Sequence, residues 1–96
     1  MRNKFGPLKK INRTNLNKQS ESPGVYGIYN DQSRLLRIGR AKQGRIDERV
    51  AENKAEVPGA QKYGFIPTNT VQDAIKLETK MLRNRKPRYN KETKGK

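Results

Sequence analysis

Cysteine and histidine are both absent from the 96 residues of this sequence. Their absence excludes a disulfide, a Cys/His zinc site, a thiol nucleophile and an imidazole base. If the protein does chemistry, its base must be a carboxylate, a lysine, a tyrosine, or water on a hard metal ion held by oxygen ligands.

Long hydrophobic runs are also lacking. No stretch approaches the ~20 consecutive apolar residues of a membrane span, and no basic amphipathic helix carries bulky apolar residues on its other face. The N-terminal MRNKFGPLKK has no apolar run of signal-peptide length. We therefore expect no membrane partner and an intracellular, cytoplasmic location.

Acidic residues are scarce, because only 9 Asp and Glu stand against 23 Lys and Arg, which gives a formal net charge of +14. Self-repulsion at this charge costs folding free energy, and the same charge concentrates polyanions around the chain. The composition therefore predicts nucleic acid as the partner.

The chain has room for one small domain. Residues 1–21 are mostly basic and polar and are predicted to form a basic N-terminal arm, partly ordered through Phe5, Leu8, Ile11 and Leu16. Residues 22–90 are predicted to form the folded domain, and residues 91–96 a basic tail.

The uncharged stretch SPGVYGIYN, residues 22–30, marks the first predicted strand. Its alternation places Tyr26 and Ile28 on one face and Val25 and Tyr29, the latter a core aromatic, on the other. The elements predicted after it are a turn over 30–33, a strand over 35–39, a helix over 45–56, a strand over 62–66 and a helix over 71–85 that Thr70 caps and Pro87 ends.

The last predicted helix carries a glutamate within its apolar face. On a helical wheel Glu78 falls inside the arc formed by Val71, Ala74, Ile75, Leu77, Met81 and Leu82. A buried carboxylate without a partner is costly. Glu78 is therefore either paired with a buried arginine or lysine, or directed into a cleft where it holds a metal ion or a proton.

Five short motifs in order resemble the GIY-YIG nuclease family. They are PGVY at 23–26, RIG at 37–39 followed by the basic RAK at 40–42, an arginine at the start of the next helix, LE at 77–78 and KPRYN at 86–90. The resemblance covers about residues 22–90. It implies an α+β fold with a three-stranded antiparallel sheet flanked by helices.

The resemblance also implies phosphodiester hydrolysis with one Mg²⁺ or Mn²⁺ ion, which one or two carboxylates suffice to hold. Glu78 would hold the metal, and Tyr26 would position or deprotonate the attacking water. An arginine would neutralise charge on the phosphate. A two-residue insertion brings Arg49 to the family position, and Arg45, on the same helical face, is the other candidate.

Two positions depart from the family pattern. Arg37 replaces the tyrosine of the second motif, and it would either bind phosphate or clamp Glu78 and displace the metal. Asn53 occupies the place where many members have histidine or tyrosine, and an amide is no general base. Lys54, with its pKa lowered by neighbouring positive charge, or Tyr26 alone would then be the base.

We therefore expect a small metal-dependent endonuclease acting on duplex or branched DNA, with specificity supplied by a partner protein or self-association. The residues expected to contact nucleic acid are Arg37, Arg40, Lys42, Arg45, Arg49, Lys86, Arg88 and Asn90. The alternative is a catalytically impaired protein of this fold that only binds nucleic acid. A basic ribosomal or RNA-packaging protein is the third and weakest reading.

Overall fold

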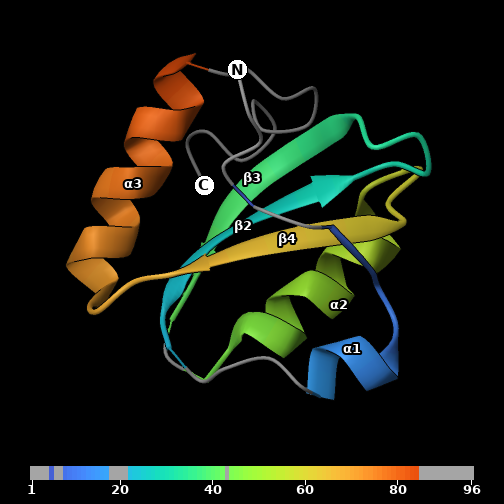
Figure 1. Cartoon of the computed structure of the whole chain (residues 1–96), viewed down its shortest axis with the longest axis horizontal. Coiled ribbons are helices and arrows are strands. Elements are labelled where there is room, and N and C mark those ends of the chain that lie inside the picture. Colours follow the sequence, from blue (N-terminus) through green and yellow to red (C-terminus); the bar gives the residue numbers. More distant parts are fainter. Residues whose placement is uncertain (1–4, 6–7, 18–21, 43, 85–96) are drawn as a thin grey trace.

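A computed structural model describes residues 5, 8–17, 22–42 and 44–84 (Figure 1). In chain order its elements are β1 (Lys9–Lys10), α1 (Arg13–Asn17), β2 (Gly24–Tyr29), β3 (Leu35–Ala41), α2 (Ile46–Glu56), β4 (Lys62–Pro67) and α3 (Val71–Asn84). The four strands form one antiparallel sheet in the order β1-β4-β2-β3. The predicted α+β class is thus confirmed, and the sheet has a fourth short strand.

The uncharged stretch forms the centre of this sheet. β2 pairs with β3 on one side and with β4 on the other, and all six of its residues are buried. A strand covered on both faces and paired at both edges has no position where a charged side chain reaches water. This explains why residues 22–30 carry no charge in such a basic chain.

Helices cover both faces of the sheet, with α3 on one side and α2 on the other (Figure 1). On the α2 side, Ile46 and Val50 pack in a cluster with Tyr26 and Ile28. On the α3 side a second cluster contains Val25, Tyr29, Ile38, Ala74 and Met81 together with Phe5. The predicted alternation along β2 is therefore confirmed, and Tyr29 is a core residue. Ile75, predicted within the apolar face of α3, is 38% exposed.

The turn between β2 and β3 is built around Asn30. Its side-chain oxygen accepts hydrogen bonds from the backbone N–H groups of Gln32 and Arg34, each at 2.9 Å. The pairing register then shifts, because Tyr29 faces Leu35 whereas Ile28 faces Arg37. Leu36 is the extra residue of this β-bulge. As a result Leu36 packs in the α2-side cluster and Arg37, next to it, also faces α2.

The N-terminal segment, predicted as an arm, contributes structure to the domain. Lys9 and Lys10 pair with β4, and Ile11 is 7% exposed. Phe5 is 4% exposed and its ring lies edge-on to Tyr29 at a centroid distance of 6.1 Å. A two-residue strand has too little periodicity to be recognised from sequence. The predicted helix stop at Pro87 lies outside the described residues.

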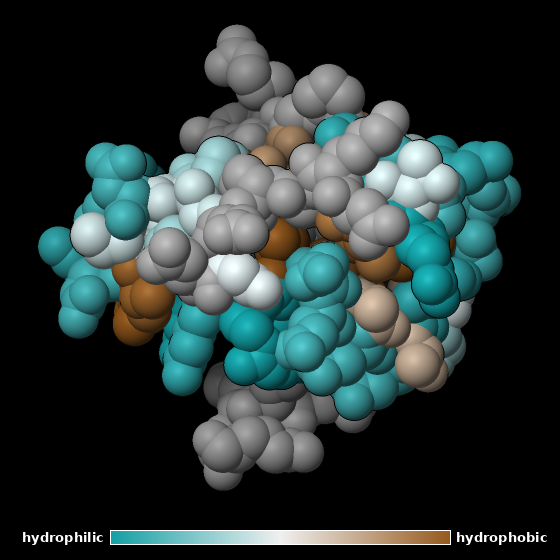
Figure 2. Space-filling view, turned by 90° about the horizontal axis from the view of Figure 1, so that it is seen from below, coloured by the Kyte–Doolittle hydropathy of each residue, from teal (hydrophilic) through white to brown (hydrophobic). Residues whose placement is uncertain are grey.

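The outer face over α1 and α2 is mostly hydrophilic, with apolar residues visible only in small areas (Figure 2). No helix within the described ranges is long and apolar enough to cross a membrane.

We expect Phe5→Ala to lower the free energy of unfolding by about 3 kcal/mol, because it removes a buried aromatic ring and leaves a cavity. Urea unfolding followed by circular dichroism measures this loss. Lys9→Ala, at an exposed position of β1, is the control and should change stability by less than about 0.5 kcal/mol. Equal midpoints for Phe5→Ala and the wild type would show that the N-terminal segment does not belong to the folded core.

Candidate active site

A groove of about 580 Å³ lies along β3, the edge strand of the sheet. Its lining residues come from the sheet, from α2 and from α3: Tyr26, Arg37, Ile38, Gly39, Arg40, Ala41, Lys42, Arg45, Arg49, Val71 and Glu78. The groove therefore brings together seven of the residues that the sequence singled out: Tyr26, Arg37, Arg40, Lys42, Arg45, Arg49 and Glu78. Five of these carry a positive charge.

Tyr26 forms the buried floor of the groove. It lies on the central strand, faces Gly39 of β3 in the sheet register and is 0% exposed. A Cβ atom at position 39 would lie 2.4 Å from the Tyr26 hydroxyl oxygen, closer than real Cβ contacts. The glycine of the RIG motif is thus needed because the phenol lies directly over it.

Asn53 of α2 contacts the Tyr26 hydroxyl. Its amide nitrogen donates hydrogen bonds to the Tyr26 oxygen at 2.9 Å and to the backbone carbonyl of Arg49 at 2.7 Å. The hydrogen bond to the Arg49 carbonyl fixes the orientation of the Asn53 amide, because a flipped amide would place the Asn53 side-chain oxygen against the Arg49 carbonyl oxygen. The Tyr26 oxygen therefore accepts from Asn53, and its own proton remains free to donate elsewhere.

Sequence reasoning treated Asn53 only as a departure from the family pattern. The structure shows that it is 2% exposed and that its side-chain oxygen has no hydrogen-bond partner within the described residues. The available signal was a polar residue in line with Ile46 and Val50 on the apolar face of α2. That signal is the same one that identified Glu78 on α3.

The pKa of the Tyr26 hydroxyl is raised above its ordinary value of 10.0, chiefly because burial disfavours the phenolate. The positive charges of Arg49 and Arg37 oppose this rise, as does the hydrogen bond from Asn53. The negative charge of Glu78 adds to it. At neutral pH Tyr26 is therefore an uncharged phenol.

Glu78 makes an ion pair with Arg40. The two side chains come from α3 and β3, and Arg40 Nη1 lies 2.6 Å from Glu78 Oε1. The Glu78 side chain is 14% exposed, whereas that of Arg40 is 47% exposed. Glu78 thus lies in the groove lining and is also paired, and its partner is the half-exposed Arg40, not a buried cation and not Arg37.

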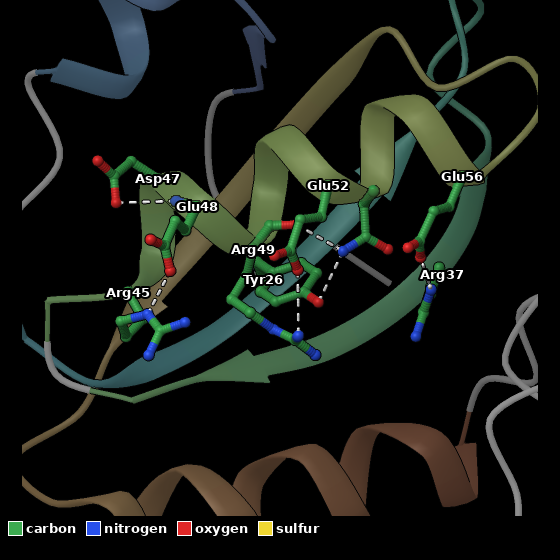
Figure 3. A network of polar contacts seen from close by, with 9 residues as sticks. Tyr26, Arg37, Arg45, Asp47, Glu48, Arg49, Glu52 and Glu56 are labelled. Carbon is green, nitrogen blue, oxygen red and sulfur yellow. Dashed lines mark hydrogen bonds and ion pairs between the residues drawn. The ribbon is translucent and has the colours of Figure 1, made fainter. Parts of the chain in front are cut away.

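Three other arginines of the groove pair with glutamates on α2 (Figure 3). The pairs are Arg45 with Glu48, Arg49 with Glu52 at 3.2 Å and Arg37 with Glu56 at 3.9 Å. These glutamates are four residues apart and so lie in one line along the helix. They are half or more exposed, and such ion pairs contribute little to stability.

Arg37 is the most buried of these cations. Its side chain is 16% exposed, and its Nε atom is buried without a hydrogen-bond partner in the part of the chain that is described. The bulge in β3 places it there, one residue after the core residue Leu36. A buried guanidinium with an unused donor beside a groove is a suitable site for an anion.

The other predicted site residues lie elsewhere. Lys54 is exposed and lines a separate hollow between α1 and α2 with Ala51 and Ala55, so the structure does not bring it to the groove. Adjacent helical residues point about 100° apart, and Asn53 takes the direction of Tyr26. Lys86, Arg88 and Asn90 lie outside the described residues.

The groove residues fit a hard divalent ion held by few protein ligands. Mg²⁺ is typically bound by one or two carboxylates and completes its coordination with water and substrate phosphate. Glu78 is the one carboxylate in the groove lining, and the described ranges contain no group of three or more acidic side chains placed to hold a metal ion together. Such a donor set suits Mg²⁺ or Mn²⁺.

The arrangement of sheet and helices matches solved structures of one nuclease fold. The N-terminal GIY-YIG endonuclease domain of UvrC from Thermotoga maritima, bound to magnesium as its catalytic divalent cation, superposes with a TM-score of 0.64. The match covers 94% of this chain and 99% of that domain at 23% identity. A variant of the same domain with a tyrosine replaced by phenylalanine also gives 0.64. The fold is therefore the GIY-YIG fold.

Sequence comparison defines the family more closely. The UvrC-like GIY-YIG domain matches residues 22–91, and the chain belongs to this family. UvrABC system protein C of Bacteroides thetaiotaomicron is 32% identical over 80 residues, which covers 73% of this chain. The same protein of Caulobacter vibrioides is 31% identical over 80 residues. The chain spans 13% and 12% of the length of these two relatives.

We expect Asn53→Leu to raise the pKa of Tyr26 further, because the phenolate loses the hydrogen bond that Asn53 donates. Ultraviolet absorbance of the tyrosines is titrated with alkali while circular dichroism defines the pH range in which the protein stays folded. Tyr63 also has a raised pKa. Subtracting the titration curve of Tyr26→Phe leaves the part of the absorbance change that comes from Tyr26. If Asn53→Leu left the pKa of Tyr26 unchanged, the assigned hydrogen bond would be contradicted.

Proposed function

We propose that the protein is a small metal-dependent endonuclease that hydrolyses phosphodiester bonds in DNA. The observation that carries this proposal is the groove in which Tyr26, Arg49 and Glu78 line one space with four further cations. A groove with five cations and one carboxylate suits the negatively charged DNA backbone. The magnesium described for the Thermotoga maritima domain supports the choice of cofactor.

Each groove residue has a role in this proposal. Glu78 would hold Mg²⁺ or Mn²⁺, and the ion, when bound, would withdraw charge from the phosphate oxygens. Arg49 is the better candidate for the catalytic arginine, because its charge acts on Tyr26 and its backbone carbonyl anchors Asn53. Arg45 precedes α2 and would contact a flanking phosphate.

Tyr26 would position the attacking water. Its pKa is raised, so the hydroxyl is protonated at neutral pH and acts through hydrogen bonds and not as a preformed phenolate. Because Asn53 already donates to the phenol oxygen, the Tyr26 proton and its remaining lone pair are left for the water and the phosphate. Lys54 lies outside the groove, so the proton lost by the attacking water would pass through solvent to the leaving oxygen.

The remaining cations would bind DNA on either side of the reacting phosphate. Arg37, Arg40 and Lys42 follow β3 along the groove, and Lys86, Arg88 and Asn90 remain proposed contacts. The substrate would be duplex or branched DNA inside the cell, and a partner protein or self-association would supply specificity. The small domain has no room for a separate sequence-reading module.

We expect the wild type to nick supercoiled plasmid with Mg²⁺ or Mn²⁺, and Glu78→Gln to lower the rate by about 100-fold, a loss typical of removing one charge-stabilising group. Gel electrophoresis of the plasmid measures the rate. Asp73→Asn, which removes an exposed acid from the same helix, should keep nearly the full rate. Cleavage that survives Glu78→Gln would place the activity at another site or in a contaminant.

A second candidate function is nucleic-acid binding without catalysis. The ion pair between Arg40 and Glu78 favours it, because an arginine occupies the carboxylate that a metal would need. Arg37, a permanent cation in place of a phenol, favours it too. Tight DNA binding without nicking in any divalent metal would establish this alternative.

Both functions predict DNA binding that weakens steeply with salt, because bound phosphates release counterions. We expect Arg37→Gln to reduce the slope of log K against log salt by about 1, the value for one lost phosphate contact. Fluorescence anisotropy with a labelled duplex over a range of salt concentrations measures the slope. Arg34→Gln, in the exposed turn before β3, is the control. Equal slopes for Arg37→Gln and Arg34→Gln would exclude Arg37 as a phosphate ligand.

A further inference from the structure

Glu78 and Arg40 meet at the point where the sheet edge faces α3. Arg40 is opposite Val25 in the register and points to the α3 side, away from the line of glutamates on α2. Within the described residues, the ion pair that Glu78 makes is the one with Arg40. The carboxylate assigned to the metal and one of the groove cations are thus held together.

Metal binding and this ion pair would use the same carboxylate. A divalent ion on Glu78 Oε1 would lie within a few ångströms of the guanidinium, and the two positive charges would repel each other strongly in a partly buried site. Movement of Arg40 away from Glu78 would therefore favour metal binding at this carboxylate. The Arg40 side chain is 47% exposed, so it has space to turn into the groove.

We propose that Arg40 couples metal binding to nucleic-acid binding, an inference that rests on the proposed function. A backbone phosphate in the groove offers Arg40 a more highly charged partner than Glu78. When Arg40 turns to the phosphate, Glu78 is released and takes the divalent ion, and a phosphate oxygen is available as a further ligand. The metal site is thus completed only on the substrate.

The other groove arginines are not paired with the carboxylate assigned to the metal. Arg45, Arg49 and Arg37 are paired with Glu48, Glu52 and Glu56 of α2. Their release onto phosphates would free carboxylates of α2 that are not in the groove lining. Arg40 alone among the paired arginines described is bound to the carboxylate of the groove. Its removal should therefore affect metal affinity differently from the removal of an equal charge nearby.

The coupling has a thermodynamic consequence. If duplex DNA raises the affinity for the metal by a given factor, the metal raises the affinity for duplex DNA by the same factor. Couplings of this type usually amount to between about 5-fold and 150-fold. Free protein would therefore take up divalent ions weakly, and metal and DNA would bind together.

The test measures Mn²⁺ binding by electron paramagnetic resonance of the free ion, with and without a saturating short DNA duplex. We expect the duplex to raise the Mn²⁺ affinity of the wild type about tenfold, within the usual range of such couplings. Glu78→Gln with the same duplex measures the Mn²⁺ held by DNA and by other sites, and this background is subtracted.

Arg40→Gln should raise the Mn²⁺ affinity of the free protein about fivefold, and the duplex should then add less than about twofold, because the competing cation is already gone. The matched control is Lys76→Gln, which removes one exposed positive charge from α3, two residues from Glu78, and leaves the Arg40–Glu78 pair intact. It should raise the affinity less than about twofold and retain the effect of the duplex.

If Arg40→Gln and Lys76→Gln changed the Mn²⁺ affinity equally, the change would be a general charge effect and the coupling would be overturned. The coupling would also be overturned if the duplex raised the Mn²⁺ affinity of the wild type no more than it raised that of Glu78→Gln. Either result would be compatible with the nuclease proposal, provided that Mn²⁺ binding depends on Glu78. Binding that is the same in wild type and Glu78→Gln would instead remove the metal site and both proposals with it.

Discussion

The site depends on the close approach of Tyr26 to Gly39, which brings the central strand, the edge strand and α2 into one fixed arrangement. A Cβ at position 39 would lie 2.4 Å from the phenol oxygen, so any larger residue would displace the ring or the strand. The same oxygen accepts a hydrogen bond from Asn53, whose amide also holds the Arg49 carbonyl. Because Gly39 has no side chain, Tyr26, α2 and Arg49 can all lie beside one groove.

Positive charge is the second constraint on this fold. Five cations line the groove of a chain with a net charge of +14, and their repulsion would oppose folding. The glutamates of α2 and Glu78 place one carboxylate beside each of the four arginines Arg37, Arg40, Arg45 and Arg49. Because ion pairs with exposed partners are weak, the three contacts with the glutamates of α2 relieve repulsion and are still easily exchanged for phosphates. The groove is therefore compatible both with folding and with a polyanionic ligand.

Local patterns predicted the long elements, and the family resemblance singled out several residues that the structure places in the groove lining. The alternation along β2 and the apolar arc of α3 mark their buried faces, and the predicted cap is present, with the Asp73 N–H bonded to Thr70 Oγ1 at 3.0 Å. Which arginine reaches Glu78 depends on how β3 and α3 pack, and the bulge that buries Arg37 leaves no mark in the residue pattern. Lys54 and Asn53 are neighbours in sequence, yet only the packing of α2 shows that Asn53 faces Tyr26.

The central claim is that Glu78 binds a divalent ion once a phosphate has drawn Arg40 away. A crystal structure with Mn²⁺ and a short DNA duplex tests it most directly, because anomalous scattering locates the ion independently of the surrounding atoms. The account predicts an anomalous peak at the Glu78 carboxylate and the Arg40 guanidinium on a backbone phosphate. An intact Arg40–Glu78 pair with duplex in the groove, and no ion at Glu78, would contradict it.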